Sequence, residues 1–478
     1  MLQTQAYLDL TFKQPFWLPP LPDRIDRSRL ARAAARRRRP PPAPAHMQIE
    51  VCLHPGVVAS VEQLRAEVLA LVHAAAGVHE LHDGDELDLS TSHVLSKHCR
   101  HVRVFEVAAA ATSTPMVHVH QLFDEEPAEE SADGDDEAVA FQLWTLPAAE
   151  FDGLWESLIY EESIQPKLLR YVSTAMRFSE SGVDSRVIQW NRVVLLHGPP
   201  GTGKTSLCKG LAHKLAIRMA SVYAQGHLVE VNAHSLFSKW FSESGKLVLG
   251  MFARIREILE DEGGFVCVLI DEVESLTSAR QAAVAGSEPS DAVRVVNALL
   301  TQLDQLRRYK NVLILTTSNL TNAIDDAFLD RADIKMFIGN PSVAARYQIL
   351  RGCLHELGRV GLLAPFEPLL EGAALASLMP SPLPTFEQLA ALEQAAHTPV
   401  GMAAPRNSMA LHAVALACEG CSGRALRKLP FLAHALHAPQ TDLPLPVEAF
   451  LNALYATALS EAEGRGARRE AAAVSSAP

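Results

Sequence analysis

A glycine-rich turn that ends in a lysine and a threonine is the part of this sequence best suited to chemistry. The run is Gly198-Pro-Pro-Gly-Thr-Gly-Lys-Thr205, and the apolar segment Val193–His197 precedes it. A buried strand, a glycine turn and a helix N-terminus in this order direct backbone N–H groups and the positive end of a helix dipole into one concavity. Lys204 can reach the terminal phosphates of a nucleotide, and the Thr205 hydroxyl can ligate Mg²⁺. The pattern predicts that the chain binds a nucleoside triphosphate.

Two carboxylates follow a second apolar segment. Phe265–Ile270 has the composition of a strand buried on both faces of a parallel sheet, and Asp271 and Glu272 come directly after it. Because the carboxyl ends of parallel strands meet at one edge of a sheet, this pair should lie beside the glycine-rich turn. We predict that Asp271 holds Mg²⁺ through water and that Glu272 polarises the attacking water, although such a pair can also merely cap the next helix.

A polar amide, Asn319, closely follows a third strand-like segment, Asn311–Thr317. From that edge its side chain can orient the same water, although asparagine at a strand end is also common turn chemistry. The predicted nucleotide-binding residues are therefore Gly198, Pro199, Pro200, Gly201, Thr202, Gly203, Lys204, Thr205, Ser206 and Asp271, with Thr205 and Asp271 as the Mg²⁺ ligands.

The arrangement of strand-like and helical segments predicts an α/β fold with a parallel sheet. Such segments alternate from Val193 to about Gly339; a small α+β pattern precedes them, and an Ala- and Leu-rich helical pattern follows. The expected divisions are a disordered extension (1–46), the α+β domain (47–123), an acidic loop (124–143), a helical linker (144–190), the large nucleotide-binding domain (191–340), a helical domain (341–460) and a flexible tail (461–478).

Composition narrows the class of protein further. The 478 residues carry a net charge of −12, but nine acidic side chains lie between Asp124 and Glu137 and the remainder is near neutral, which gives no basis for nonspecific nucleic-acid binding. No run reaches the roughly 18 apolar residues of a membrane span, so we expect a soluble chain.

Of seven cysteines only Cys418-Glu-Gly-Cys421 has metal-like spacing, which favours reduced thiols of an intracellular protein over a zinc site. The run Arg36–Arg39 could direct nuclear import or belong to a transit peptide, and the role of 1–46 stays open.

Three strand-end features in this order resemble the AAA+ ATPases: the glycine turn as Walker A, Ile270-Asp-Glu-Val-Glu-Ser-Leu276 as Walker B, and Thr316-Thr-Ser-Asn319 as sensor 1. Four further runs narrow the resemblance to the pachytene checkpoint protein 2 family, which includes thyroid hormone receptor-interacting protein 13. They are Ser238-Lys-Trp-Phe-Ser-Glu-Ser-Gly-Lys-Leu-Val248, Glu288-Pro-Ser-Asp-Ala-Val-Arg294, Asp330-Arg-Ala-Asp-Ile-Lys335 and Ser422-Gly-Arg-Ala-Leu-Arg-Lys-Leu-Pro430. The similarity is close over 144–356 and 420–438, loose over 47–123, and absent from 1–46 and much of 360–415.

The resemblance implies further site residues. Arg331 matches the arginine finger that reaches a neighbouring subunit's nucleotide, although the common Arg-Pro-Gly-Arg run is missing and a surface ion pair is the simpler alternative. Arg424 matches sensor 2 on a helical lid, with Arg427 as the fallback if the register slips by one turn. Trp240 and Phe241 match a pore loop that grips substrate, or they anchor the loop, and Gly286–Ser290 would be a weaker pore element. The predicted catalytic residues are Glu272, Asn319, Arg331 and Arg424.

The resemblance also implies a function. It implies a homo-hexameric ring that uses ATP and Mg²⁺ to convert closed HORMA-domain proteins to the open form, engaging them through the N-terminal domain and often through a HORMA-fold adaptor. The implied roles are disassembly of the mitotic (spindle) checkpoint complex and control of meiotic chromosome axes and recombination, in the nucleus on chromosomes and in the cytoplasm. No direct contact with nucleic acid or membrane is expected.

Two other functions stay open as alternatives. A motor acting on nucleic acid would need basic pore or N-terminal surfaces, whereas the candidate pore residues Trp240 and Phe241 are aromatic. A nucleotide-gated scaffold that does not hydrolyse ATP would typically lack the Walker B glutamate or the finger, and both Glu272 and Arg331 are present. The identity of the client, the need for an adaptor, the balance of mitotic and meiotic work and the effect of the unusual stretch 362–408 stay open.

Overall fold

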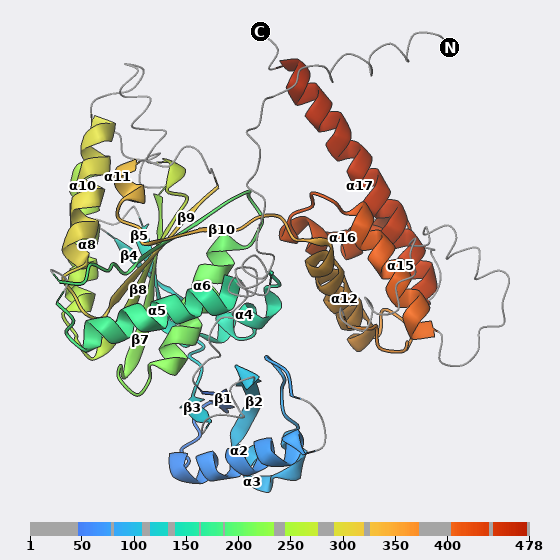
Figure 1. Ribbon diagram of the computed structural model, residues 1–478, viewed down its shortest axis with the longest axis horizontal. Coiled ribbons are helices and arrows are strands. Elements are labelled where there is room, and N and C mark those ends of the chain that lie inside the picture. The colour runs from blue at the N-terminus through green and yellow to red at the C-terminus, as the bar shows by residue number, and fades with distance from the viewer. Residues whose placement is uncertain are drawn as a thin grey trace, which may run out of the picture.

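The computed structural model shows a small N-terminal α+β domain, a large α/β domain and a C-terminal helical domain (Figure 1). This is the architecture predicted from the sequence. The structure describes residues 46–77, 81–107, 115–131, 139–161, 164–184, 187–233, 244–275, 291–319, 326–371, 403–438 and 443–475.

The N-terminal domain is a three-stranded sheet with helices on one face. Its strands are β1 (Gln48–Leu53), β2 (Cys99–Phe105) and β3 (Met116–His120) in the order β2-β1-β3, with β1 antiparallel to β2 and parallel to β3. Its helices are α2 (Val61–Ala76), the 3₁₀ turn η1 (Leu89–Thr91) and α3 (His93–His98). Ile49 and Val51 of β1 pack with Leu64 and Val68 of α2 in a core of their own. Because successive side chains of a strand alternate, the intervening residues lie on the opposite face.

The large domain is built on a seven-stranded sheet in the order β10-β6-β9-β8-β7-β5-β4. The five strands from β10 to β7 are parallel, and β5 and β4 extend the sheet antiparallel. The central strands β8 and β9 are buried along nearly their whole length, which explains their apolar composition. The strands are β4 (Ala128–Ser131), β5 (Val139–Leu146), β6 (Val193–His197), β7 (Gln225–Asn232), β8 (Gly264–Asp271), β9 (Val312–Ser318) and β10 (Ile334–Phe337).

Helices cover both faces of this sheet (Figure 1). Val266, Val268 and Ile270 of β8 pack against α8 (Ser244–Leu259) and α10 (Asp291–Leu306). The alternate residues Cys267 and Leu269 pack on the other face, against α5 (Ile164–Glu180) and α6 (Lys204–Arg218). The short helix α11 (Asp326–Leu329) precedes β10. The central parallel strands β6, β9 and β8 are therefore apolar on both sides, and their carboxyl ends are left to carry polar groups.

Two segments before the glycine turn are strands, where the sequence predicted a loop and a helix. Ala128–Ser131 lies within the expected acidic loop 124–143, and Val139–Leu146 runs from that loop into the expected helical linker. The chain reaches α5 only after the 3₁₀ turn η3 (Ala149–Phe151) and the four-residue helix α4 (Leu154–Ser157). The physical reason is tertiary: β5 pairs with β7, which would otherwise present an open sheet edge.

The C-terminal domain is a helical bundle, as predicted. Its helices are α12 (Val343–Arg359), α15 (Ala403–Ala417), α16 (Gly423–Leu436) and α17 (Val447–Ser475), around one core. The tail 461–478 was expected to be flexible, but α17 continues through it to Ser475. Its alanines, glutamates and arginines are strong helix formers, which accounts for the extension. None of the described helices is long and apolar enough to cross a membrane.

Candidate nucleotide-binding site

The glycine turn links the end of β6 to the start of α6. Gly198 has a φ of +144°, and a Cβ added there would lie only 2.2 Å from the carbonyl oxygen of Ile338. Ile338 cannot easily retreat, because its N–H donates to the carbonyl of His197 at 2.8 Å. Glycine is therefore required at this position by the close approach of the chain that follows β10.

Lys204 is the first residue of α6 and is buried within the turn. Its Nζ donates to the carbonyl of Gly198 at 2.9 Å and to that of Pro199 at 2.8 Å. Burial lowers the pKa of Lys204, and the nearby carboxylates of Glu274, Asp271 and Glu272 oppose that shift. The ammonium group thus lies across the loop, at the end of α6 where its dipole favours an anion.

The predicted magnesium ligands lie together. The Thr205 hydroxyl is 3.0 Å from one carboxylate oxygen of Asp271 and 3.1 Å from the other, and the Thr317 hydroxyl donates to the same carboxylate. A hydroxyl next to a carboxylate at a strand end is a donor set of hard oxygens, which suits Mg²⁺. The residues present therefore fit the metal that the fold implies.

Glu272 and Asn319 lie at the same edge of the sheet. Glu272 follows β8 with a φ of +59°, an unusual value for a residue other than glycine, and its N–H donates to the Thr317 hydroxyl at 3.2 Å. Asn319 follows β9, the strand between β8 and β6. Non-glycine residues in this left-handed region are often found at functional sites, because the strain must be offset by the surrounding structure.

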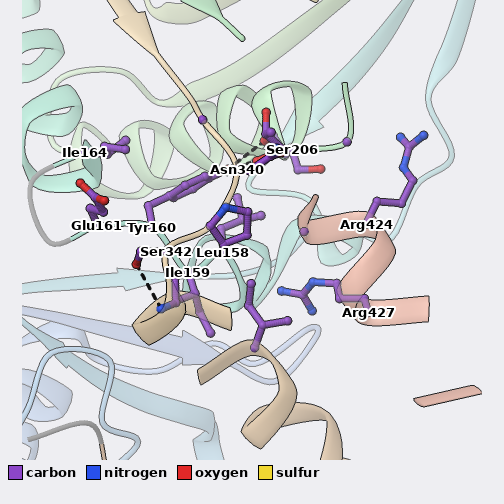
Figure 2. A pocket seen from close by; sticks show the side chains of 18 of the residues that line it. Leu158, Ile159, Tyr160, Glu161, Ile164, Ser206, Asn340, Ser342, Arg424 and Arg427 are labelled. Carbon is purple, nitrogen blue, oxygen red and sulfur yellow. Dashed lines mark hydrogen bonds between the residues drawn. The ribbon is translucent and has the colours of Figure 1, made fainter. Parts of the chain in front are cut away.

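A cavity of about 470 Å³ opens beside the glycine turn (Figure 2). One wall is apolar, and the lid supplies two arginines, a combination that suits a flat base and its phosphates. The sequence predicted Gly201, Thr202, Gly203, Ser206 and Arg424 for the site, and all line this cavity. It did not predict the segment before α5, nor the start of α12. The lining residues outside the prediction include Leu158, Ile159, Tyr160, Glu161, Ile164, Asn340, Ser342 and Ile349.

Tyr160 connects this wall to the turn. Its hydroxyl donates to the carbonyl of Gly203 at 3.1 Å and lies 3.3 Å from that of Thr202. A Cβ added at Gly203 would lie 2.7 Å from this hydroxyl, so the two segments are in close contact. Burial raises the pKa of Tyr160, which keeps the phenol protonated as a donor. Nothing in the local sequence indicated this role, because it depends on how a distant segment docks.

The lid approaches the turn through the start of α16. The N–H of Arg424 donates to the carbonyl of Gly201 at 3.1 Å. In Figure 2 the guanidinium of Arg427 is turned toward the other labelled residues of the cavity, whereas that of Arg424 is turned away. Arg427 donates to the carbonyl of Ser157, at the end of α4. Both candidates for sensor 2 therefore line the cavity, and in this conformation Arg427 reaches across it.

The structure does not bring Arg331 to this cavity. Its guanidinium makes two hydrogen bonds to Asp304 of α10, at 3.0 and 2.7 Å. This position on the opposite layer of the sheet is compatible with either a finger for a neighbouring subunit or an ion pair within the chain. Trp240, Phe241 and Gly286–Ser290 lie outside the described residues.

Comparison with known proteins defines the class. A family model described as "ATPase family associated with various cellular activities (AAA)" matches residues 194–340, and one described as "TRIP13-like, AAA+ ATPase lid C-terminal domain" matches residues 342–462. The phosphate-binding turn, the acidic strand end beside it and this lid together define an AAA+ ATPase, an enzyme that binds and hydrolyses ATP.

Individual relatives narrow the class to a family. The chain is 55% identical over 357 residues to the Pachytene checkpoint protein 2 homolog of Oryza sativa subsp. indica, covering 74% of this chain and 72% of the relative. It is 46% identical over 422 residues to the Mus musculus homolog, covering 85% of this chain and 91% of the relative. The solved structure of C. elegans PCH-2 is similar, with a TM-score of 0.68 and 34% identity over 87% of this chain and 99% of that chain. The chain belongs to the pachytene checkpoint protein 2 family.

Proposed function

We propose that this chain forms a homo-hexameric ring that uses ATP hydrolysis to convert closed HORMA-domain proteins to their open form. The observation that carries the proposal is family membership combined with an intact set of nucleotide-site residues, above all the Thr205 hydroxyl paired with Asp271. The separate N-terminal domain, with its own core, supplies a part that can hold a client or a HORMA-fold adaptor. We further propose the three domains expected from the sequence: the N-terminal domain over 47–123, the large nucleotide-binding domain over 191–340 and the helical lid over 341–460.

In this proposal the residues at the carboxyl edge of the sheet share the hydrolytic work. Thr205 and Asp271 hold Mg²⁺, which when bound supplies positive charge against the phosphates. Glu272 orients the attacking water and accepts its proton, and Asn319 orients the same water from β9. Lys204 exchanges its backbone carbonyl partners for phosphate oxygens, and the arginines of α16 approach from the lid.

The proposed roles of Arg331 and of the pore residues depend on assembly of the chain into a ring. Arg331 serves the nucleotide of the neighbouring subunit, and its paired hydrogen bonds to Asp304 hold the guanidinium in a fixed orientation. Trp240 and Phe241 grip the client by apolar contact, which needs no particular client sequence. A motor acting on nucleic acid and a nonhydrolysing scaffold are the alternatives, and no described feature specifically favours either.

The cellular roles follow from the same assignment. We propose disassembly of the mitotic checkpoint complex and removal or recycling of meiotic chromosome-axis proteins. The corresponding locations are the nucleus, on chromosomes, and the cytoplasm. The names of the rice and mouse relatives support the meiotic role.

The test combines ATP turnover with client opening. The ATPase rate is measured with and without a closed HORMA-domain protein and a HORMA-fold adaptor, and opening is followed in the same reaction. We expect ATP-dependent opening in the parent, and in Glu272→Gln we expect retained ATP binding with turnover reduced at least about 100-fold, since the group that handles the water's proton is lost. Glu356→Gln, on an exposed face of the lid, is the matched control and should behave like the parent.

The outcomes separate the parts of the proposal. Robust ATPase without opening would leave the ATPase intact and refute the HORMA client class. Normal turnover by Glu272→Gln would refute the role of Glu272.

A further inference from the structure

The face of the N-terminal sheet opposite α2 is polar and yet largely covered. Pairing across the strands places Glu50 beside Arg103 and His118, and Cys52 beside His101 and His120. We call this surface the polar face; its members are Gln48, Glu50, Cys52, His101, Arg103, His118 and His120. Glu50 is only 3% exposed and His101 only 5%. Charged and imidazole groups are rarely buried to this degree unless they have partners.

The partner is the last part of α6, the helix that begins with Lys204. Every residue of α6 from Leu211 to Ile217 is buried, which a helix on the outside of a sheet achieves only if a second layer covers it. Lys214 is 2% exposed; it forms an ion pair with Glu50, and its Nζ lies 3.8 Å from the centre of the Phe105 ring. The N-terminal domain is therefore the second layer.

Three ion pairs of 2.8 Å or less join opposite charges on the two surfaces, and Glu50 also lies 3.6 Å from Arg218. Glu50 pairs with Lys214, Glu106 pairs with Arg218 at 2.6 Å, and Arg103 pairs with Asp152 at 2.8 Å. The N-terminal domain thus contributes two negative charges and one positive, and the large domain contributes the opposite set. Burial would raise the pKa of Glu50, but the charges of Lys214 and Arg218 outweigh it and lower the pKa to about 2, so the carboxylate stays ionised.

An interface of this chemistry can separate. Buried ion pairs add little net stability, because each charge regains its hydration when the surfaces part. The Nδ1 atoms of His120 and His213 are buried there without a hydrogen-bond partner among the described residues, which further weakens the docked state. The N-terminal domain also keeps its own apolar core on the α2 side of its sheet, so parting from α6 would leave that core intact.

The same lysine is connected to the nucleotide cavity through α4. Lys214 pairs with Glu156 of α4 as well as with Glu50. The residue after Glu156 accepts a hydrogen bond from Arg427 of the lid, and Leu158, one position further, lines the cavity. The helix α4 therefore touches the N-terminal domain through Lys214, and touches both the cavity and the lid through its own end.

We infer that the polar face is a docking surface for α6 of the same chain, and that this contact ties the position of the N-terminal domain to the nucleotide cavity through Lys214 and α4. When the domain is docked, Lys214 is shared between Glu50 and Glu156. When it parts, Lys214 keeps only Glu156 and α4 is free to shift. Coupling of this kind is reciprocal: nucleotide binding must influence docking as much as docking influences nucleotide binding.

The experiment uses the full-length chain and removes one charge from each side. Glu50→Gln changes the N-terminal domain only, and Lys214→Met changes α6 only while it keeps an apolar side chain of similar length. Hydrogen exchange of β3 and of the last two turns of α6 reports docking, and the Kd of a fluorescent ADP analogue reports the cavity. Glu356→Gln, in an exposed ion pair of α12, is the control.

We expect exchange in both elements to become at least tenfold faster in each single variant, and the Kd to change at least fivefold in the same direction in both. The double variant should change hydrogen exchange and Kd no more than the stronger of the two single variants does, because the same Glu50–Lys214 contact is lost in all three variants. Slow exchange at the central strand β1 would show that the N-terminal domain itself stays folded. If Glu50→Gln unfolds this domain, the test of docking rests on Lys214→Met, which leaves the sequence of the domain unchanged. Unchanged exchange in Lys214→Met would overturn the docking surface, and faster exchange with an unchanged Kd would overturn the coupling.

Discussion

Replacing Gly198 by alanine tests the geometry of the phosphate-binding turn most directly. The added Cβ would lie 2.2 Å from the carbonyl oxygen of Ile338, so the glycine turn or the backbone at Ile338 would have to move by about 1 Å to reach an ordinary contact distance. That carbonyl belongs to backbone anchored by the hydrogen bond from Ile338 to His197, and no flexible side chain is available to yield. Alanine is also strained at a φ of +144°.

The cost can be estimated from these two effects. Overpacking costs roughly 1–3 kcal/mol, and a strained backbone costs roughly 1–3 kcal/mol more. The total of about 2–6 kcal/mol is a large part of the 5–15 kcal/mol that stabilises a typical domain, and corresponds to a fall in Tm of about 5–20 °C. Nucleotide affinity should fall as well, because the turn supplies the N–H groups that hold phosphate.

The assay is a thermal melt without nucleotide, with a second glycine as control. Gly352 is exposed in the interior of α12 and has nothing within 4 Å of an added Cβ. Gly352→Ala should therefore raise stability by roughly 0.5–1 kcal/mol, since alanine loses less backbone entropy in a helix. If Gly198→Ala melted within about one degree of the parent, the close approach of the chain after β10 would be refuted.

Three further predictions concern the cavity, the pore and the buried histidines. Tyr160→Phe should weaken ADP binding about threefold to tenfold in a fluorescence titration while the melt changes little, because one hydroxyl that positions Gly203 is lost; unchanged affinity would argue against that role. Trp240→Ala should lower client opening far more than basal ATPase, and equal losses would indicate a structural role. Burial holds the pKa of His213 at about 3 and those of His118 and His120 at about 4, below the usual 6.5. The folded chain therefore binds fewer protons, so stability present above pH 6.5 should be lost as the pH falls toward 4, by roughly 1 kcal/mol per histidine at about pH 5.5; melts that do not shift between about pH 7.5 and 5.5 would contradict this.

The part of the site that the sequence predicted is the part that local rules determine. A strand, a glycine turn and a helix start are contiguous, so the position of Lys204 follows from its neighbours. The meeting of Thr205 with Asp271 needs one further rule, that parallel strands end at a common edge. This rule sufficed because β8 and β6 are separated only by β9 in the sheet.

The remaining part depends on contacts between distant segments. Leu158 and Tyr160 resemble any short apolar stretch until they dock beside Gly203. The strand Val139–Leu146 follows an acidic run that suggests a solvated loop, and only pairing with β7 makes it a strand. Residue propensity and charge predicted a loop and a helix there, and this was wrong because pairing with the open edge of β7 stabilises a strand more strongly than local preferences oppose it.

The polar face shows a more general limit of reading strands by alternation. In β1, Ile49 and Val51 alternate with Glu50, and in β3, Val117 and Val119 alternate with His118. Alternation of this kind is ordinarily read as a sheet with one face toward water. Here the second face is covered by a helix whose charges match it, and the signal for that helix lies more than 90 residues away, in Lys214 and Arg218. The polar half of an alternating strand is thus compatible with either solvent or a charged partner, and α6 can be that partner because its final turns place a lysine and an arginine on the side away from the large sheet.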